Sequence, residues 1–141
     1  MKLKIGDPAP LFTATATDGS SIKLSEYLGT KLVLYFYPMD DTPGCTKQAC
    51  SLRDHNQEIQ AKGAAILGVS TQDAASHQKF TEKYHLTFPL VADTDGAVAH
   101  AYGAMGGGGL ISSAMSLLGV ANRITFIIDE SGHIAHIIDK P

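Results

Sequence analysis

Cysteine is scarce in this sequence, which has only Cys45 and Cys50 among its 141 residues. Two cysteines are too few for a disulfide-stapled scaffold, and in a reducing cytosol they are expected to be catalytic, redox-active or inert core residues. Their spacing suits neither the tight Cys-x-x-Cys redox pair nor a zinc clamp. Their role therefore has to be inferred from the residues around them.

Other absences narrow the class of protein. No apolar run reaches the roughly 20 residues of a membrane span, and the N-terminus, "MKLKIGDPAP", lacks the apolar region of a signal peptide. The net charge of -3 gives no indication of binding to nucleic acid or to anionic lipid. We therefore expect a cytoplasmic protein that binds neither nucleic acid nor membrane, with a single domain over residues 1–141.

Strand and helix patterns alternate along the chain. Uninterrupted apolar runs such as "KLVLYFYP" and "AAILGVS" are typical of strands covered on both faces. The expected elements are a hairpin over 11–24 that turns at Asp18 and Gly19, a helical turn from Ser25, strands at 31–38, 64–70 and 88–93, helices at 43–62, 73–85 and 96–103, and a closing hairpin over 124–138. This order predicts an α/β fold, a three-layer sandwich with a mixed central sheet.

The segment "AMGGGGLISSAMSLLGVAN", residues 104–122, does not fit this alternation. Four successive glycines have the largest backbone entropy cost on ordering, so we expect the segment to be mobile. The apolar residues after them have helical spacing over about 12 residues, too few to span a membrane. They predict either a surface helix packed on the domain or a docking surface for a second subunit or a reductant.

The helix predicted over 43–62 places Cys45 in its first turn, where unpaired N–H groups and the helix dipole favour a thiolate anion. Asp41 or Thr42 can cap this helix, and Gly63 can end it. Its inward stripe is formed by Cys45, Ala49, Leu52, Asn56 and Ile59. On a regular helix the Cα atoms of the two cysteines lie about 8.7 Å apart, whereas a disulfide needs about 4.4 to 6.8 Å.

The mouth of this helix has the features of a small polar binding site. The amides of Gly44 and Cys45 are open to approach, because glycine has no side chain to block them. The hydroxyl of Thr42 can both accept and donate a hydrogen bond, and Pro38 and Pro43 would stiffen and wall the loop. The combination predicts a ligand with an O–H group and developing negative charge. Taken singly, these residues have plainer readings as a core thiol, an N-cap and a helix start.

The segment "PMDDTPGCTKQAC" resembles the active-site loop of peroxiredoxins, specifically of the bacterioferritin-comigratory or Q-type group. Its pattern, Pro-x-x-x-Thr-x-x-Cys, is filled by Pro38, Thr42 and Cys45. The similarity continues through "RDH", "ILGVST", "SHQKF", "EKYHLTFPLVAD" and "RITFIIDESGHI", and so covers nearly the whole chain. It implies a thioredoxin-like fold and an antioxidant thiol peroxidase that needs no cofactor and no metal.

The resemblance also implies a role for each matching residue. Cys45 would be the peroxidatic cysteine, which attacks a peroxide oxygen and becomes a sulfenic acid, while Thr42 and the backbone amides hold the peroxide. Arg123 matches the arginine that stabilises the thiolate and the departing oxygen, and Gln48 is expected to orient it. Cys50 matches the resolving cysteine, which forms an intramolecular disulfide with Cys45 once the first turns of the helix unwind.

The implied substrates are hydrogen peroxide and organic hydroperoxides, the implied partner is a thioredoxin- or glutaredoxin-like reductant, and the chain is expected to act as a monomer or a weak dimer. Two features depart from the group. Residues 104–122 stand where a charged, aromatic-containing loop is usual. A further helix usually follows the last strand, whereas this sequence stops at Pro141, so we expect an exposed apolar sheet face.

Three other functions were weighed against a peroxidase. A disulfide oxidoreductase on the same fold is disfavoured because the chain lacks Cys-x-x-Cys. A peroxide-sensing redox switch would use the same disulfide without efficient turnover, so turnover separates it from a peroxidase. Metal binding has the weakest support, because the histidines are scattered along the chain, at His55, His77, His85, His100, His133 and His136.

Overall fold

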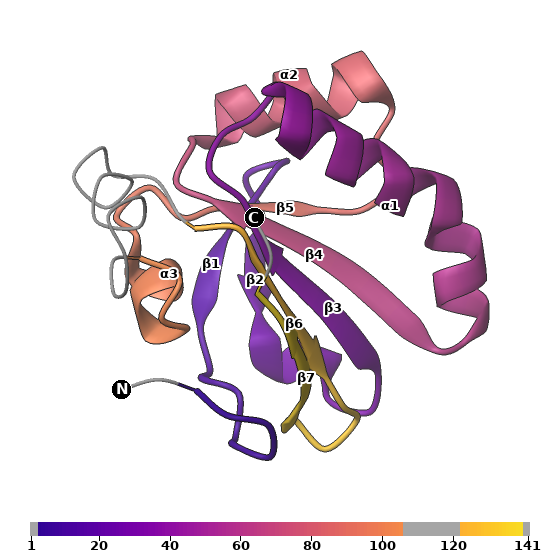
Figure 1. Cartoon of the computed structure of the whole chain (residues 1–141). Helices are drawn as coiled ribbons and strands as arrows, with labels where there is room; N and C mark the ends of the chain where they lie inside the picture. The colour runs from indigo at the N-terminus through magenta and orange to yellow at the C-terminus, as the bar shows by residue number, and fades with distance from the viewer. Residues whose placement is uncertain (1–2, 106–121, 140–141) are drawn as a thin grey trace.

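The computed structural model describes residues 3–105 and 122–139, which form a seven-stranded sheet with helices on both faces (Figure 1). The strands are β1 (Thr13–Ala16), β2 (Ser21–Lys23), β3 (Lys31–Phe36), β4 (Ala64–Ser70), β5 (Leu90–Ala92), β6 (Ile124–Ile128) and β7 (Ile134–Ile138). The helices are a 3-10 turn, η1 (Leu24–Tyr27), and α1 (Pro43–Ala61), α2 (Ala74–Tyr84) and α3 (Ala97–Ala101). The strand order is β2-β1-β5-β4-β3-β6-β7.

The centre of the sheet is parallel and its flanks are antiparallel. β4 pairs in parallel with both β3 and β5, whereas β6 runs antiparallel to β3, and β1 runs antiparallel to β5. Parallel neighbours need a crossover of about a dozen residues or more, and α1 and α2 supply these crossovers. The two helices therefore lie side by side on one face of the sheet (Figure 1). The predicted α/β sandwich with a mixed sheet is confirmed.

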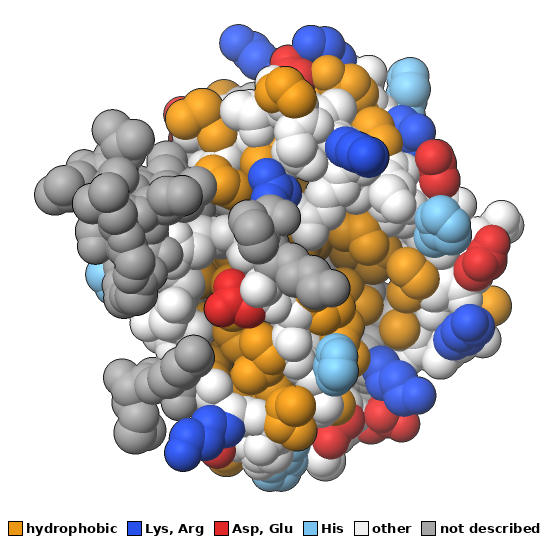
Figure 2. Space-filling model, in the orientation of Figure 1, with side chains coloured by type: hydrophobic (Ala, Val, Ile, Leu, Met, Phe, Trp, Pro, Cys, Tyr) orange, Lys and Arg blue, Asp and Glu red, His pale blue; other side chains and the backbone are white. Residues whose placement is uncertain are grey.

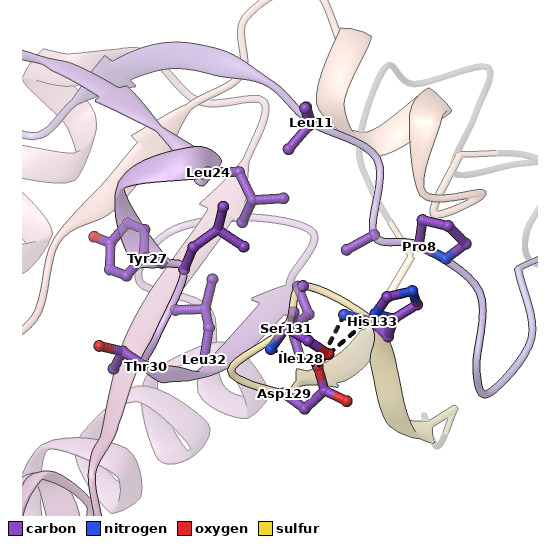
Figure 3. A pocket seen from close by; sticks show the side chains of 13 residues that line it. Pro8, Leu11, Leu24, Tyr27, Thr30, Leu32, Ile128, Asp129, Ser131 and His133 are labelled. Carbon is purple, nitrogen blue, oxygen red and sulfur yellow. Dashed lines mark hydrogen bonds between the residues drawn. The ribbon is translucent and has the colours of Figure 1, made fainter.

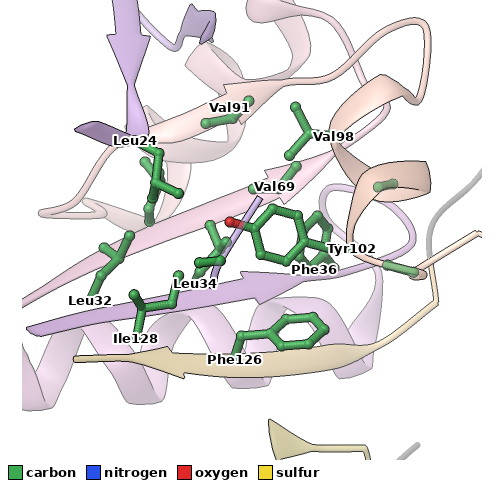
Figure 4. Close-up of a cluster of buried hydrophobic side chains, with 14 of the residues drawn as sticks. Leu24, Leu32, Leu34, Phe36, Val69, Val91, Val98, Tyr102, Phe126 and Ile128 are labelled. Carbon is green, nitrogen blue, oxygen red and sulfur yellow. The ribbon is translucent and has the colours of Figure 1, made fainter. Parts of the chain in front are cut away.

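Side chains of β3 alternate between two hydrophobic cores. Leu32, Leu34 and Phe36 belong to the larger core, to which α3 and η1 also contribute (Figure 4). Tyr35, and Tyr37 just beyond the end of the strand, belong to a second core, which also contains residues of α1 and α2. Because both faces of β3 are covered, the strand has no polar break, which accounts for the uninterrupted apolar run in the sequence.

The long helix α1 follows the predicted pattern. It starts at Pro43 with Thr42 at the N-cap, and its end is followed by Gly63, whose φ of 78° breaks the helix. The buried residues of α1 are Cys45, Ala49 and Asn56, and Leu52 and Ile59 pack against the second core. The stripe predicted from the sequence is therefore the face that α1 turns towards the sheet.

The strand expected over 88–93 is shorter in the structure, where β5 spans Leu90–Ala92, because neither predicted end continues the strand. Pro89 has no N–H to donate to the ladder, so β5 begins after it, at Leu90. Asp93 leaves the strand and accepts hydrogen bonds from the amides of Val98 and Ala99 at 3.0 and 2.8 Å, which caps α3. Burial raises the pKa of Asp93, although these two amides act in the opposite direction.

Two expectations concern the surface of the molecule. The apolar helix predicted within 104–122 lies largely outside the described residues. Ile138 of β7 pairs with Thr125 and is 42% exposed, and Figure 2 shows further apolar side chains at the surface below α1. Among the described residues, no helix is both long enough and apolar enough to cross a membrane.

Candidate active site

Cys45 lies at the N-terminal end of α1, just beyond the C-terminal end of β3. Its side chain is buried against Ala49 and the aromatic residues of the second core, and the residue is 1% exposed. Because Pro43 and Gly44 precede it in the first helical turn, Cys45 lies among amides that have no carbonyl partner within the helix. Such amides, together with the helix dipole, stabilise a negative charge on the sulfur.

Arg123 brings a positive charge to the same sulfur from the other half of the chain. It directly precedes β6, the strand that pairs with β3, so its side chain reaches the end of β3 where α1 begins. Its Nη2 donates to Cys45 Sγ at 3.1 Å, and its Nη1 donates to Gln48 Oε1 at 2.7 Å. Gln48 therefore holds the guanidinium against the thiol, as the sequence predicted.

Gly44 leaves the space that this contact needs. A Cβ atom at this position would lie 3.1 Å from Arg123 Nη2, closer than most real contacts of a Cβ atom.

Thr42 stands at the N-cap, but its side chain does not cap the helix as one reading of the sequence expected. Its hydroxyl instead donates to the carbonyl of Met39 at 3.1 Å. The lone pairs of the Thr42 oxygen thus remain available to a ligand.

Two further predicted site residues, Pro38 and Cys50, lie close to Cys45 in the sequence. Pro38 is the second residue after the end of β3 and is partly buried, and its role as a wall of the site stays a prediction. Cys50 is a free thiol, as is Cys45, and it is more exposed than Cys45. Helix α1 continues unbroken through both cysteines. In this state the two thiols are kept apart by regular helix geometry, as the sequence predicted.

Two tyrosines beneath the site contribute no charge near neutral pH. Burial is the main cause that raises the pKa of Tyr35 and of Tyr37 well above the usual value for tyrosine. Their rings stack with centroids 5.4 Å apart, and the hydroxyl of Tyr37 donates to Asp40. Both tyrosine hydroxyls therefore stay uncharged, so no phenolate offsets the positive charge that Arg123 brings to the sulfur of Cys45.

Sequence reasoning missed a buried polar cluster in the active-site loop. Asp40, which stands two residues before Thr42, is hydrogen-bonded to Tyr37, Ser76 and His77, and three of these four residues lie in a core environment. The only sequence signal is the pair of aspartates shortly before the predicted helix, of which Asp41 is expected as a possible cap and Asp40 has no predicted role. The partners on α2 could not be assigned without the packing of α2 against the loop.

A pocket of about 250 Å³ lies at the opposite end of the sheet (Figure 3). Leu32, near the start of β3, lines it, whereas Cys45 follows the end of that strand. Its polar residues Asp129, Ser131 and His133 are hydrogen-bonded to one another within the β6–β7 turn. These bonds, chiefly from the amide of His133, lower the pKa of Asp129. Asp129, Ser131 and His133 therefore serve to hold the β6–β7 turn that forms one wall of the pocket.

No group of three or more potential metal ligands occurs within residues 3–105 and 122–139. The groups that surround Cys45 are its own thiol, a guanidinium, a hydroxyl and backbone amides. Together these groups form a nucleophilic sulfur beside donors that can stabilise a developing oxyanion.

Comparisons with known proteins agree with this chemistry. Residues 5–137 match the model of the AhpC/TSA family. The chain is 39% identical over 137 residues to peroxiredoxin Bcp of Escherichia coli, covering 97% of this chain and 86% of that protein. It is similar to the crystal structure of peroxidoxin BcpB from Mycobacterium tuberculosis, with a TM-score of 0.84, 33% identity and coverage of 97% and 86%. It is also similar to the bacterioferritin comigratory protein of Xanthomonas campestris, with a TM-score of 0.82, 30% identity and coverage of 92% and 81%; that structure was described for alkyl peroxide reduction.

Proposed function

Because the chain belongs to the AhpC/TSA family, and to its thiol-dependent peroxidases of the Bcp and Q type, we propose that it reduces hydrogen peroxide and organic hydroperoxides through Cys45. The observation that carries this proposal is the contact of 3.1 Å between Arg123 Nη2 and Cys45 Sγ at the start of α1. A thiolate is the reactive form of cysteine, and both the guanidinium and the helix N-terminus stabilise it.

The first step follows from the groups around the sulfur. The thiolate of Cys45 attacks one oxygen of the peroxide, the O–O bond breaks, and the other oxygen leaves as hydroxide or alkoxide and takes up a proton. Cys45 becomes a sulfenic acid, and water or an alcohol is released. Arg123 and the first-turn amides stabilise the departing oxygen. The hydroxyl of Thr42, whose hydrogen is engaged by Met39, accepts a hydrogen bond from the peroxide O–H.

The second step needs a change of shape. The thiol of Cys50 attacks the sulfenic sulfur of Cys45, and water leaves as the disulfide forms. A thioredoxin- or glutaredoxin-like dithiol then reduces this disulfide and becomes a disulfide itself. We further propose that the protein acts in the cytoplasm, where a reducing environment returns the thiols to the reactive form, and that it acts as a monomer or a weak dimer.

Turnover tests the proposal most directly. With thioredoxin, thioredoxin reductase and NADPH, the protein is expected to consume many equivalents of hydrogen peroxide per chain, with Cys45→Ser as the blank. A sensor would instead consume about one equivalent of peroxide for each Cys45 and then remain as the disulfide. Accumulation of the Cys45–Cys50 disulfide after one equivalent, with both thioredoxin and glutaredoxin supplied, would replace the peroxidase by a peroxide-sensing switch.

Gly44→Ala is expected to separate reactivity from stability. Alanine favours a helix over glycine by about 0.8 to 1 kcal/mol, so α1 should become slightly more stable. The added Cβ would lie 3.1 Å from Arg123 Nη2 and force the guanidinium away from the sulfur. We expect the second-order rate constant with hydrogen peroxide to fall about fivefold, as a misplaced group lowers a rate, while the unfolding midpoint does not fall. Ser51→Ala, at an exposed position further along α1, is the control, and a normal rate in Gly44→Ala would show that Arg123 has room to adjust.

A further inference from the structure

The carboxylate of Asp40 ties the active-site loop to the end of β3 and to α2. The hydroxyl of Tyr37 donates to its Oδ1 at 2.6 Å, and the hydroxyl of Ser76 donates to its Oδ2 at 2.7 Å. His77 Nδ1 lies 2.7 Å from the same Oδ2. The side chain of Asp40 is 4% exposed and that of His77 is fully buried. A carboxylate with this many partners in the interior fixes the backbone that carries it.

The hydrogen positions at His77 follow from its partners. Nε2 lies 2.8 Å from the carbonyl oxygen of Val91, and because a carbonyl only accepts, Nε2 carries a hydrogen. A single proton then lies between His77 Nδ1 and Asp40 Oδ2, bonded to one of these two atoms and hydrogen-bonded to the other. The pair as a whole has no net charge, so its burial leaves no uncompensated charge in the core.

The neighbouring residue Asp41 makes a second, exposed contact with α2. Its carboxylate accepts from Lys83 Nζ at 2.7 Å and from the hydroxyl of Tyr84 at 2.5 Å. These bonds, that of Lys83 first, lower the pKa of Asp41. Asp41 has a φ of 58°, a left-handed conformation that a residue other than glycine keeps only where contacts on either side hold it.

We propose that Asp40 and His77 are positioning residues for peroxide reduction, forming a fixed anchor that holds Thr42 in place while α1 unwinds. This inference rests on the function proposed above. The partners of Asp40 belong to the end of β3 and to α2, and His77 in turn bonds to the carbonyl of Val91 in β5; none of these residues belongs to α1. Unwinding the first turn of α1 therefore breaks none of these contacts. The hydroxyl of Thr42 donates to Met39, on the anchored side of the loop.

Asp40→Ala tests the anchor, and Val98→Ala is the control for a general loss of stability. We expect Asp40→Ala to lower the second-order rate constant of Cys45 with hydrogen peroxide about tenfold, because a displacement of about 1 Å can lower a rate by about a hundredfold. Val98→Ala truncates a buried residue of the other core, away from the loop. It should lower the unfolding midpoint but leave the rate constant unchanged. Loss of rate in both variants to the same extent would make Asp40 merely structural.

Asparagine at the same position separates geometry from charge. The amide of Asp40→Asn can accept from Tyr37 and donate to Nδ1 of a neutral His77, so the anchor is kept without the carboxylate. This variant should retain most of the rate constant that alanine loses. Glu82→Ala, which removes an exposed carboxylate of α2 away from the loop, should change the rate constant by less than about twofold. Asparagine as slow as alanine would overturn the positioning role.

Two milder variants cover the case in which Asp40→Ala does not fold. Tyr37→Phe and Ser76→Ala each remove one hydrogen bond to Asp40 and nearly preserve volume. Each should lower the rate constant about threefold, and unchanged rates in both would overturn the proposal.

An anchor that works during unwinding must also survive disulfide formation, which the oxidant diamide can drive without peroxide. The His77 Nε2–H signal should exchange slowly in both redox forms. A protein that keeps this signal but does not react with peroxide would refute the proposed function alone, whereas loss of the signal in the disulfide form would refute the anchor.

Discussion

Arg123→Met is expected to lower the second-order rate constant for oxidation of Cys45 by hydrogen peroxide about a hundredfold, the loss that is typical when one preorganised donor is removed. The guanidinium lies 3.1 Å from the sulfur, where it stabilises both the thiolate and the oxygen that leaves. Methionine keeps the length and the apolar part of the side chain but removes every donor. Stopped-flow mixing of the reduced Cys50→Ser protein with peroxide measures this step alone.

The matched control is Arg53→Met, which removes an arginine that lies on α1 itself, away from the site. Arg53 donates to Asp54 and to the carbonyl of Tyr84, so its loss changes the net charge equally without reaching Cys45. Its rate constant should stay within about twofold of the parent, since exposed ion pairs contribute little. A parent-like rate constant in Arg123→Met would show that the helix N-terminus suffices to activate the thiol.

Much of the fold could be predicted because local patterns and packing agree. β3 is covered on both faces and reads as an unbroken apolar run, and the stripe along α1 reads as a helix face. The least accurate boundaries were those of β5, where Pro89 has no N–H to donate to the ladder and Asp93 is used to cap α3. Such competing uses of a single residue depend on the tertiary structure and are not visible in a pattern.

The site was predictable to the extent that it lies in one segment. Thr42, Gly44 and Cys45 are neighbours in the sequence, so their chemistry could be inferred together. Arg123 is 78 positions from Cys45 and meets it only because β6 pairs with β3, and it was assigned through the family resemblance. The contact of Asp40 with His77 requires α2 to pack against the loop, and the sequence offered no local signal for it.

Cys50→Ser is expected to abolish sustained turnover with a thioredoxin-like reductant while leaving the first oxidation of Cys45 intact. The role of Cys50 comes after peroxide attack, so the rate constant of the first step should not change. The variant should then stop as a sulfenic acid and proceed to the sulfinic acid under excess peroxide, since no second thiol closes the disulfide. Mass spectrometry distinguishes these products. Ser51→Ala, one position further along α1, is the control and should turn over normally.

The disulfide itself requires α1 to open. On an intact helix the Cα atoms of Cys45 and Cys50 are about 8.7 Å apart, whereas a disulfide allows at most about 6.8 Å. The reduced protein has an unbroken α1 through both residues, so the oxidised protein must lose at least the turn that contains them. Amides of residues 43–53 are therefore expected to exchange with solvent faster in the disulfide form than in the dithiol form. Equal protection in both forms, with the Cys45–Cys50 bond verified by mass, would rule out unwinding.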